Sequence, residues 1–113
     1  MRIITATLSL NDLQKMAVDT FGDIVKAVVD IDRELMAVDA ELHADLEARL
    51  LEDGSQQKHL WGINLYPEAP ADEFIEFDSM INVRPSQDNR SRGVENEAIR
   101  KKIIHIVGKR IAR

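Results

Sequence analysis

The sequence contains no cysteine, only 3 prolines and 5 glycines, and few aromatic side chains. The absence of cysteine excludes disulfides, thiolate metal ligands and a cysteine nucleophile, and it is typical of proteins from a reducing compartment. With 1 tryptophan and 1 tyrosine, the chain lacks the aromatic platform on which single-stranded nucleic acids stack. The composition therefore argues against cysteine-based chemistry and against binding of single-stranded nucleic acid by base stacking.

No apolar run is long enough to cross a membrane. A spanning helix needs about 20 consecutive apolar residues, whereas the longest apolar stretches, at Ile24–Ile31 and Ile103–Val107, are short and interrupted. The first residues also lack the apolar region and the cleavage site of a secretion signal. We therefore expect a cytoplasmic protein without a membrane segment.

The balance of residue types indicates one ordinary globular domain. The 113 residues are 44% hydrophobic and 31% charged, with a net charge of −5. Residues 1–89 hold 7 basic and 18 acidic side chains, whereas residues 90–113 hold 8 and 2. An acidic protein binds nucleic acid poorly, because phosphate neutralisation supplies most of that affinity. The basic segment is expected mainly to complement the acidic body on which it packs.

Residue periodicity predicts eight elements in the order β-α-β-β-α-β-β-α. They are a strand at 3–7, a helix at 10–21, strands at 25–31 and 35–38, a short helix at about 45–51, strands at 60–66 and 74–84, and a last helix after residue 96. Ser9 and Asn96 are the expected N-caps, and Gly22 is expected to end the first long helix. The turn after residue 31 lacks Gly, Asn and Pro, so a helix over 30–39 is the alternative there.

Hairpins joined in this order predict an α+β fold. We expect a two-layer sandwich, in which two main helices cover one face of a mainly antiparallel sheet of about five strands. No repeat or low-complexity segment divides the chain, so residues 1–113 are expected to form a single α+β domain. In the strand at 74–84, alternation places Phe74, Met80 and Asn82 on the outward face, where they indicate a partner surface or dimer seam. A solvated polar face is the alternative.

The polar loop before the last helix is the strongest candidate site. It carries Arg84, Asn89, Arg90, Ser91 and Arg92 ahead of a helix amino terminus. Guanidinium groups and free backbone N–H groups together suit a phosphate or a carboxylate. The spacing matches no phosphate-loop motif. Pairing of these arginines with the acidic body is the structural alternative.

Glu41, His43 and Asp45 form a second, weaker pattern. In an extended segment they would share one face, and such a set can bind a divalent metal or act as acid, base and orienter. A solvated helix start with Asp45 as its N-cap gives the same residues. The pattern therefore assigns neither a metal nor a cofactor, and His59 and His105 have no evident partners.

Three runs of the chain resemble a known family. They are ELHADLEARLLEDGS at 41–55, LWGINLYP at 60–67 and FIEFDSMINVRPSQDNRSRGVENEAIRKKI at 74–103. They are similar to a small family of prokaryotic proteins described only as a domain of unknown function, and the resemblance covers nearly the whole chain. It implies a stand-alone cytosolic domain and brings no activity, ligand or catalytic residue.

Two function classes remain open. The first is a non-enzymatic binding or interaction module that acts as a homodimer or with a protein partner. The second is a small enzyme or ligand-binding protein, in which Arg84, Arg90 and Arg92 hold an anionic substrate. There His43, with Asp45 or Asp78, would exchange protons, which requires His43 to reach a pocket lined by those arginines. Contact with RNA or DNA through the last helix is the least favoured class.

Overall fold

Two long strands occupy the centre of the sheet. In the computed structural model, which describes all residues 1–113, β3 (Val25–Asp30) and β5 (Leu60–Leu65) pair antiparallel along their full length. The valines of β3, which are β-branched, favour its extended backbone. Nearly every residue of the two strands is buried. This central pair determines where the other elements pack.

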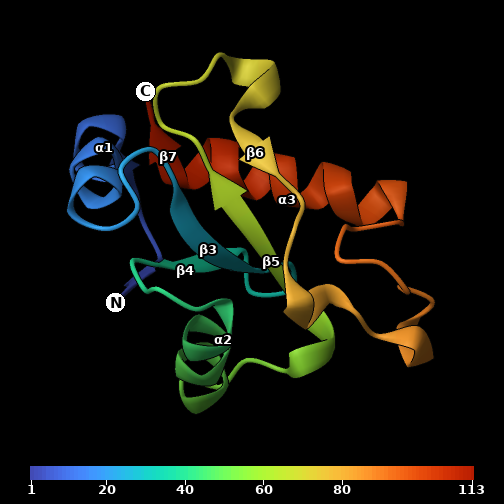
Figure 1. The fold of residues 1–113 in the computed structure, drawn as a ribbon. Coiled ribbons are helices and arrows are strands. Elements are labelled where there is room, and N and C mark those ends of the chain that lie inside the picture. Colours follow the sequence, from blue (N-terminus) through green and yellow to red (C-terminus); the bar gives the residue numbers. More distant parts are fainter.

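Three shorter strands complete an antiparallel sheet of five strands, in the order β1-β4-β3-β5-β6 (Figure 1). They are β1 (Arg2–Ile4), β4 (Leu35–Val38) and β6 (Ile75–Glu76). A separate parallel pair joins β2 (Leu8–Ser9) to β7 (Ile111–Ala112). The predicted α+β class and the antiparallel sheet are confirmed, although the first strand ends at Ile4 and not at residue 7.

The hairpin between β3 and β4 is built by a buried carboxylate. Asp30 accepts hydrogen bonds from the backbone N–H groups of Asp32 (2.9 Å) and Arg33 (3.0 Å), and from the hydroxyl of Ser55 (2.7 Å). Glu34 then takes a left-handed conformation, with φ of 55°. A side-chain turn of this kind replaces the Gly or Asn that a tight hairpin normally needs. The alternative helix over 30–39 does not form.

Helices α1 (Leu10–Asp19) and α3 (Glu97–Arg110) cover one face of the sheet, as predicted. Ser9 and Asn96 are their N-caps, since Ser9 accepts from the backbone N–H of Asp12 and Asn96 from that of Ile99, each at 3.1 Å. The 19 residues of the main core lie between these helices and the sheet. None of the helices has the length and apolar character needed to cross a membrane.

Helix α2 (His43–Glu52) packs on the opposite face of the sheet, away from α1 and α3 (Figure 1). Its Leu46 and Leu50 are fully buried against Val28, Ala37 and Leu60 in a second core of 6 residues. The second face of the sheet is therefore covered by a helix, whereas the alternation of polar residues had suggested a solvated face. The helical stripe of α2 was predicted, and the helix begins two residues earlier than expected.

The chain between residues 74 and 84 is not the long strand that alternation predicted. Only Ile75 and Glu76 pair with β5, and residues 80–82 form a 3₁₀ turn. Along the rest of this edge, the side chain of Asn82 takes the place of a strand. Its Oδ1 accepts from the N–H of Gly62 (2.8 Å) and its Nδ2 donates to the carbonyl of Gly62 (2.9 Å). An amide can satisfy both backbone groups, so no strand is required there.

This turn overturns the predicted outward face. Phe74 is 2% exposed and Asn82 is fully buried, while Met80 is 65% exposed. Phe74 packs in the main core and lies 4.1 Å beneath the guanidinium of Arg113. Two of the three interface candidates are thus inaccessible to a partner. The alternation failed because the segment leaves the sheet after two residues.

Gly62 lies where the turn approaches the sheet most closely. A Cβ placed on this residue would lie 2.5 Å from Cβ and 2.6 Å from Oγ of Ser79, closer than any real contact. Ser79 is itself buried and its N–H donates to the carbonyl of Arg92 (2.9 Å), so it cannot easily move away. Only glycine lets the turn pack flat on β5.

We expect Gly62→Ala to destabilise the protein by about 2 kcal/mol or more, because the added methyl group forces Ser79 and its turn outward. Gly108→Ala is the matched control. Its Cβ would meet no atom within 4 Å, and alanine favours the helix by about 1 kcal/mol. Urea unfolding of both variants checks the prediction, and equal stability of Gly62→Ala and the wild type would contradict it.

Candidate functional site

The arginines predicted to bind an anion do not gather at one place. Arg84 donates from one terminal nitrogen to the carbonyl of Gln57 (2.6 Å) and from the other to that of Leu60, and its guanidinium lies 4.2 Å from the centre of the Trp61 ring. Burial lowers the pKa of Arg84 below its ordinary value. Its terminal nitrogens are occupied by Gln57 and Leu60, and its Nε is buried without a partner, so Arg84 is a structural residue.

Asn89 is likewise committed to the fold. It is buried, and its Nδ2 donates to the carbonyls of Asn82 (2.7 Å), Gly93 (2.8 Å) and Ser91 (3.1 Å). Its Oδ1 accepts from the N–H of Glu95 (2.9 Å). With every polar atom of its amide used, Asn89 has no group left for a ligand.

The loop already binds an anion of its own. The backbone N–H groups of Arg90 and Ser91 donate to one carboxylate oxygen of Glu95, at 2.6 and 2.9 Å. The hydrogen bonds from Ser91 and Arg90 hold the pKa of Glu95 below its ordinary value. The sequence correctly suggests free N–H groups here, but an internal carboxylate fills the position expected for a ligand.

Arg92 points to a different part of the molecule. Its Nε donates to a carboxylate oxygen of Asp78 (2.6 Å), and its side chain helps to line a cavity of about 190 Å³. We call this cavity the His43 pocket. Its lining includes Lys26, His43, Ala44, Ser79, Met80 and Arg92. Among the predicted residues, the structure therefore brings together His43, Met80 and Arg92, with Asp78 beside them.

His43 is the most constrained polar residue of this pocket. It is 9% exposed, and its Nε2 lies 2.8 Å from the carbonyl oxygen of Ile63. A carbonyl only accepts, so Nε2 must carry the hydrogen and Nδ1 holds the lone pair of the neutral ring. Burial lowers the pKa of His43. The charges of Lys26 and Arg92 lower it further, whereas the Ile63 hydrogen bond and Asp78 raise it.

The amino terminus of α2 opens into the same pocket, since Leu42, His43 and Ala44 all line it. The N-cap residue, Leu42, makes no side-chain hydrogen bond to the first turn. The first N–H groups of a helix have no partner within the helix, and they carry a partial positive charge. The pocket thus lies beside the positive end of the α2 dipole as well as beside basic side chains.

Lys26 was missed by sequence reasoning. It lies on β3, on the face that packs α2, and forms none of the ion pairs in the structure. Its ammonium lies 5.2 Å from the centre of the Phe21 ring. A lysine within an otherwise apolar central strand is the signal that would have identified it.

The metal interpretation of Glu41, His43 and Asp45 finds no support. His43 begins α2, so the segment is not extended and the three side chains do not share one face. No group of three or more metal-ligating side chains forms anywhere in the structure. Asp45 is exposed in the first turn of α2 and is not its N-cap. Of the two predicted carboxylates, Asp78 is the one that contacts a residue of the His43 pocket, Arg92.

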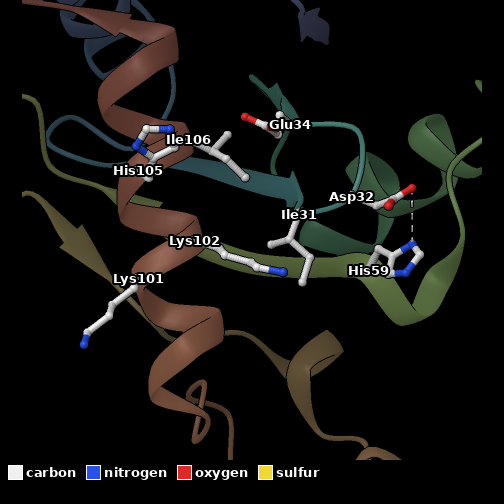
Figure 2. Close-up of a pocket in the computed structure, with 8 residues that line it drawn as sticks. All are labelled: Ile31, Asp32, Glu34, His59, Lys101, Lys102, His105 and Ile106. Atoms are coloured by element: carbon white, nitrogen blue, oxygen red, sulfur yellow. Dashed lines mark ion pairs between the residues drawn. The ribbon is translucent and has the colours of Figure 1, made fainter.

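A larger groove, of about 570 Å³, lies between α3 and the hairpin that joins β3 to β4 (Figure 2). Its polar lining residues are Asp32, Glu34, His59, Lys101, Lys102 and His105. Figure 2 shows Lys102 reaching toward Ile31, whereas Lys101 points away from the opening. We call it the α3 groove. Its residues come from three distant segments, which explains why His59 and His105 have no evident partners in the sequence.

Part of the charge around the α3 groove is neutralised by ion pairs, although Lys101 and Lys102 form none. The Nδ1 atom of His59 lies 4.0 Å from a carboxylate oxygen of Asp32, and the ammonium of Lys109 lies 3.2 Å from Glu34. Arg110 donates to the carbonyls of Glu34 (2.9 Å) and Ala6 (3.2 Å). These contacts agree with the predicted role of the basic helix, which is to complement the acidic body. The groove therefore presents charges of both signs, which makes it less selective for an anion than a purely basic pocket.

Comparison with known proteins places the chain in a family. Residues 2–110 match the family model described as Protein of unknown function (DUF5674). The chain belongs to this family. The resemblance seen in the sequence is thereby confirmed, and DUF5674 membership assigns no chemistry to any residue. No curated protein and no solved structure matches the chain.

In this DUF5674 protein, His43 should make stability depend on pH in a defined window. Because the pKa of His43 is lower in the folded state, the unfolded chain takes up a proton first as the pH falls below about 6.5. We expect the free energy of unfolding to decrease from pH 7 to pH 5.5, by no more than about 1.4 kcal/mol per pH unit.

Urea unfolding at pH 7.5, 6.5 and 5.5 measures this dependence. His43→Gln should remove it, since glutamine can still donate to Ile63 but does not titrate, whereas the exposed His105→Gln should keep it. A wild type and a His43→Gln variant with the same pH slope would contradict the assignment.

Proposed function

We propose that this protein binds a small anion, a phosphate or a carboxylate, in the His43 pocket. The observation that carries the proposal is the convergence of Lys26, His43 and Arg92 from three separate segments on one cavity. Basic side chains and a helix amino terminus complement a negative charge, and each strengthens the other in a partly buried site. The protein would act as a ligand-binding module or as a small enzyme for an anionic substrate.

The charge balance of the pocket supports this proposal. Asp78 neutralises part of the charge of Arg92, but Lys26 has no carboxylate partner. An unpaired ammonium beside a half-buried cavity gains most from an anion that enters the cavity. The Ser79 hydroxyl, which lines the pocket and accepts from the N–H of Ile81 (3.3 Å), can add a further donor.

The size of the pocket indicates a small ligand. A cavity of about 190 Å³ lies below the roughly 300 to 1,000 Å³ typical of drug-sized sites. It suits a phosphate group or a short carboxylate better than a nucleotide. The partner surface is less well supported, because Phe74 and Asn82 are buried and Met80 alone remains exposed.

Titration with inorganic phosphate and with acetate, followed by NMR and calorimetry, tests the proposal. We expect the ring signals of His43 to shift on titration. Lys26→Met should weaken binding about tenfold or more, because a hydrogen bond to a charged group contributes about 1.5–3 kcal/mol. Lys102→Met, in the α3 groove, removes the same charge elsewhere and should leave the affinity unchanged. Equal effects of the two substitutions would refute the His43 pocket as the site.

A further inference from the structure

The His43 pocket contains many hydrogen-bond donors and one well-defined acceptor. Lys26, Arg92 and the amino terminus of α2 can only donate. The hydroxyl of Ser79 already accepts from the N–H of Ile81 and has a hydrogen to donate. Asp78 lies nearby, but one of its carboxylate oxygens is engaged by Arg92 at 2.6 Å. An anion alone would satisfy the donors and leave the acceptor without a partner.

That acceptor is Nδ1 of His43. The carbonyl of Ile63 fixes the ring by accepting from Nε2, so the lone pair of the neutral imidazole is on Nδ1. Nδ1 makes no hydrogen bond within the protein, and it is not among the fully buried polar atoms that lack a partner. It therefore remains accessible on a side chain that is otherwise 9% exposed.

From this inventory we infer that the ligand is an anion that also carries a hydroxyl group close to its charge, and that His43 Nδ1 accepts the hydrogen bond from that hydroxyl. Small hydroxy acids and polyol phosphates are the chemical classes that fit. This inference rests on the proposed anion site. A site built to accept from a ligand hydroxyl rejects the analogue that lacks it, because the bound analogue covers the acceptor and leaves it unpaired.

Two pairs of probes of equal charge test the inference. They are glycolate with acetate, and glycerol 3-phosphate with propyl phosphate. At pH 7.5 we expect the hydroxylated member of at least one pair to bind the wild type about fivefold more tightly or better, as a single well-placed hydrogen bond gives. Calorimetry measures the four affinities.

Substitution of His43 distinguishes the roles of its two ring nitrogens. His43→Gln keeps an N–H donor for the carbonyl of Ile63 but has no counterpart of Nδ1. The ratio of the two affinities within each probe pair should therefore fall to about one, and this ratio is the readout even where the overall affinity also changes. His105→Gln in the α3 groove is the matched control and should retain the preference. In the wild type, lowering the pH until His43 is protonated should also abolish the preference, which gives a second readout if His43→Gln does not fold.

The outcomes distinguish this inference from the proposed function. If the probes bind but the members of each pair bind equally, or if His43→Gln retains the preference, then the hydroxyl inference is overturned and the anion pocket stands. If neither inorganic phosphate nor any probe binds, the proposed function and this inference are both overturned.

Discussion

The side-chain amide of Asn82 holds together the parts of the molecule that make its candidate site. It satisfies both backbone groups of Gly62 on the open edge of β5, and its Nδ2 also donates to the carbonyl of Arg92 at 2.9 Å. The backbone N–H and C=O groups of Gly62 are buried and need hydrogen-bond partners. The Asn82 amide that supplies these partners is therefore not free to move. It brings the turn at residues 80–82 onto the sheet and anchors the backbone from which Arg92 extends.

Much of the fold follows from patterns that act over a few residues. The caps at Ser9 and Asn96, the alternation in β3 and the apolar stripe of α3 are all local, and each correctly predicted its element. The wrong prediction of a long strand at residues 74–84 also comes from the use of local patterns. Alternation there resembles a strand, but the decisive contacts join Asn82 and Ser79 to Gly62, about 20 residues away, and no local pattern reports them.

The site was harder to predict than the fold because several residue types have two uses. Arginine and asparagine suit ligand binding, yet Arg84 and Asn89 complete the backbone hydrogen bonding of the loop and of β5. The N–H groups predicted at Arg90 and Ser91 exist, but Glu95, only a few residues further along the chain, occupies them. Lys26 is marked locally as a lysine in an apolar strand, but the packing of α2 and the turn beside it is a long-range contact that its own segment does not report.

The parallel pair of β2 and β7 has a consequence for how the chain reaches this structure. Its register joins Leu8 to Ile111, so the contact spans almost the whole sequence. Closing so large a loop costs conformational entropy before any packing compensates for it, which slows folding. Because β7 lies about 100 residues after β2, the α1 end of the main core stays incomplete until residues 111–112 have been synthesised.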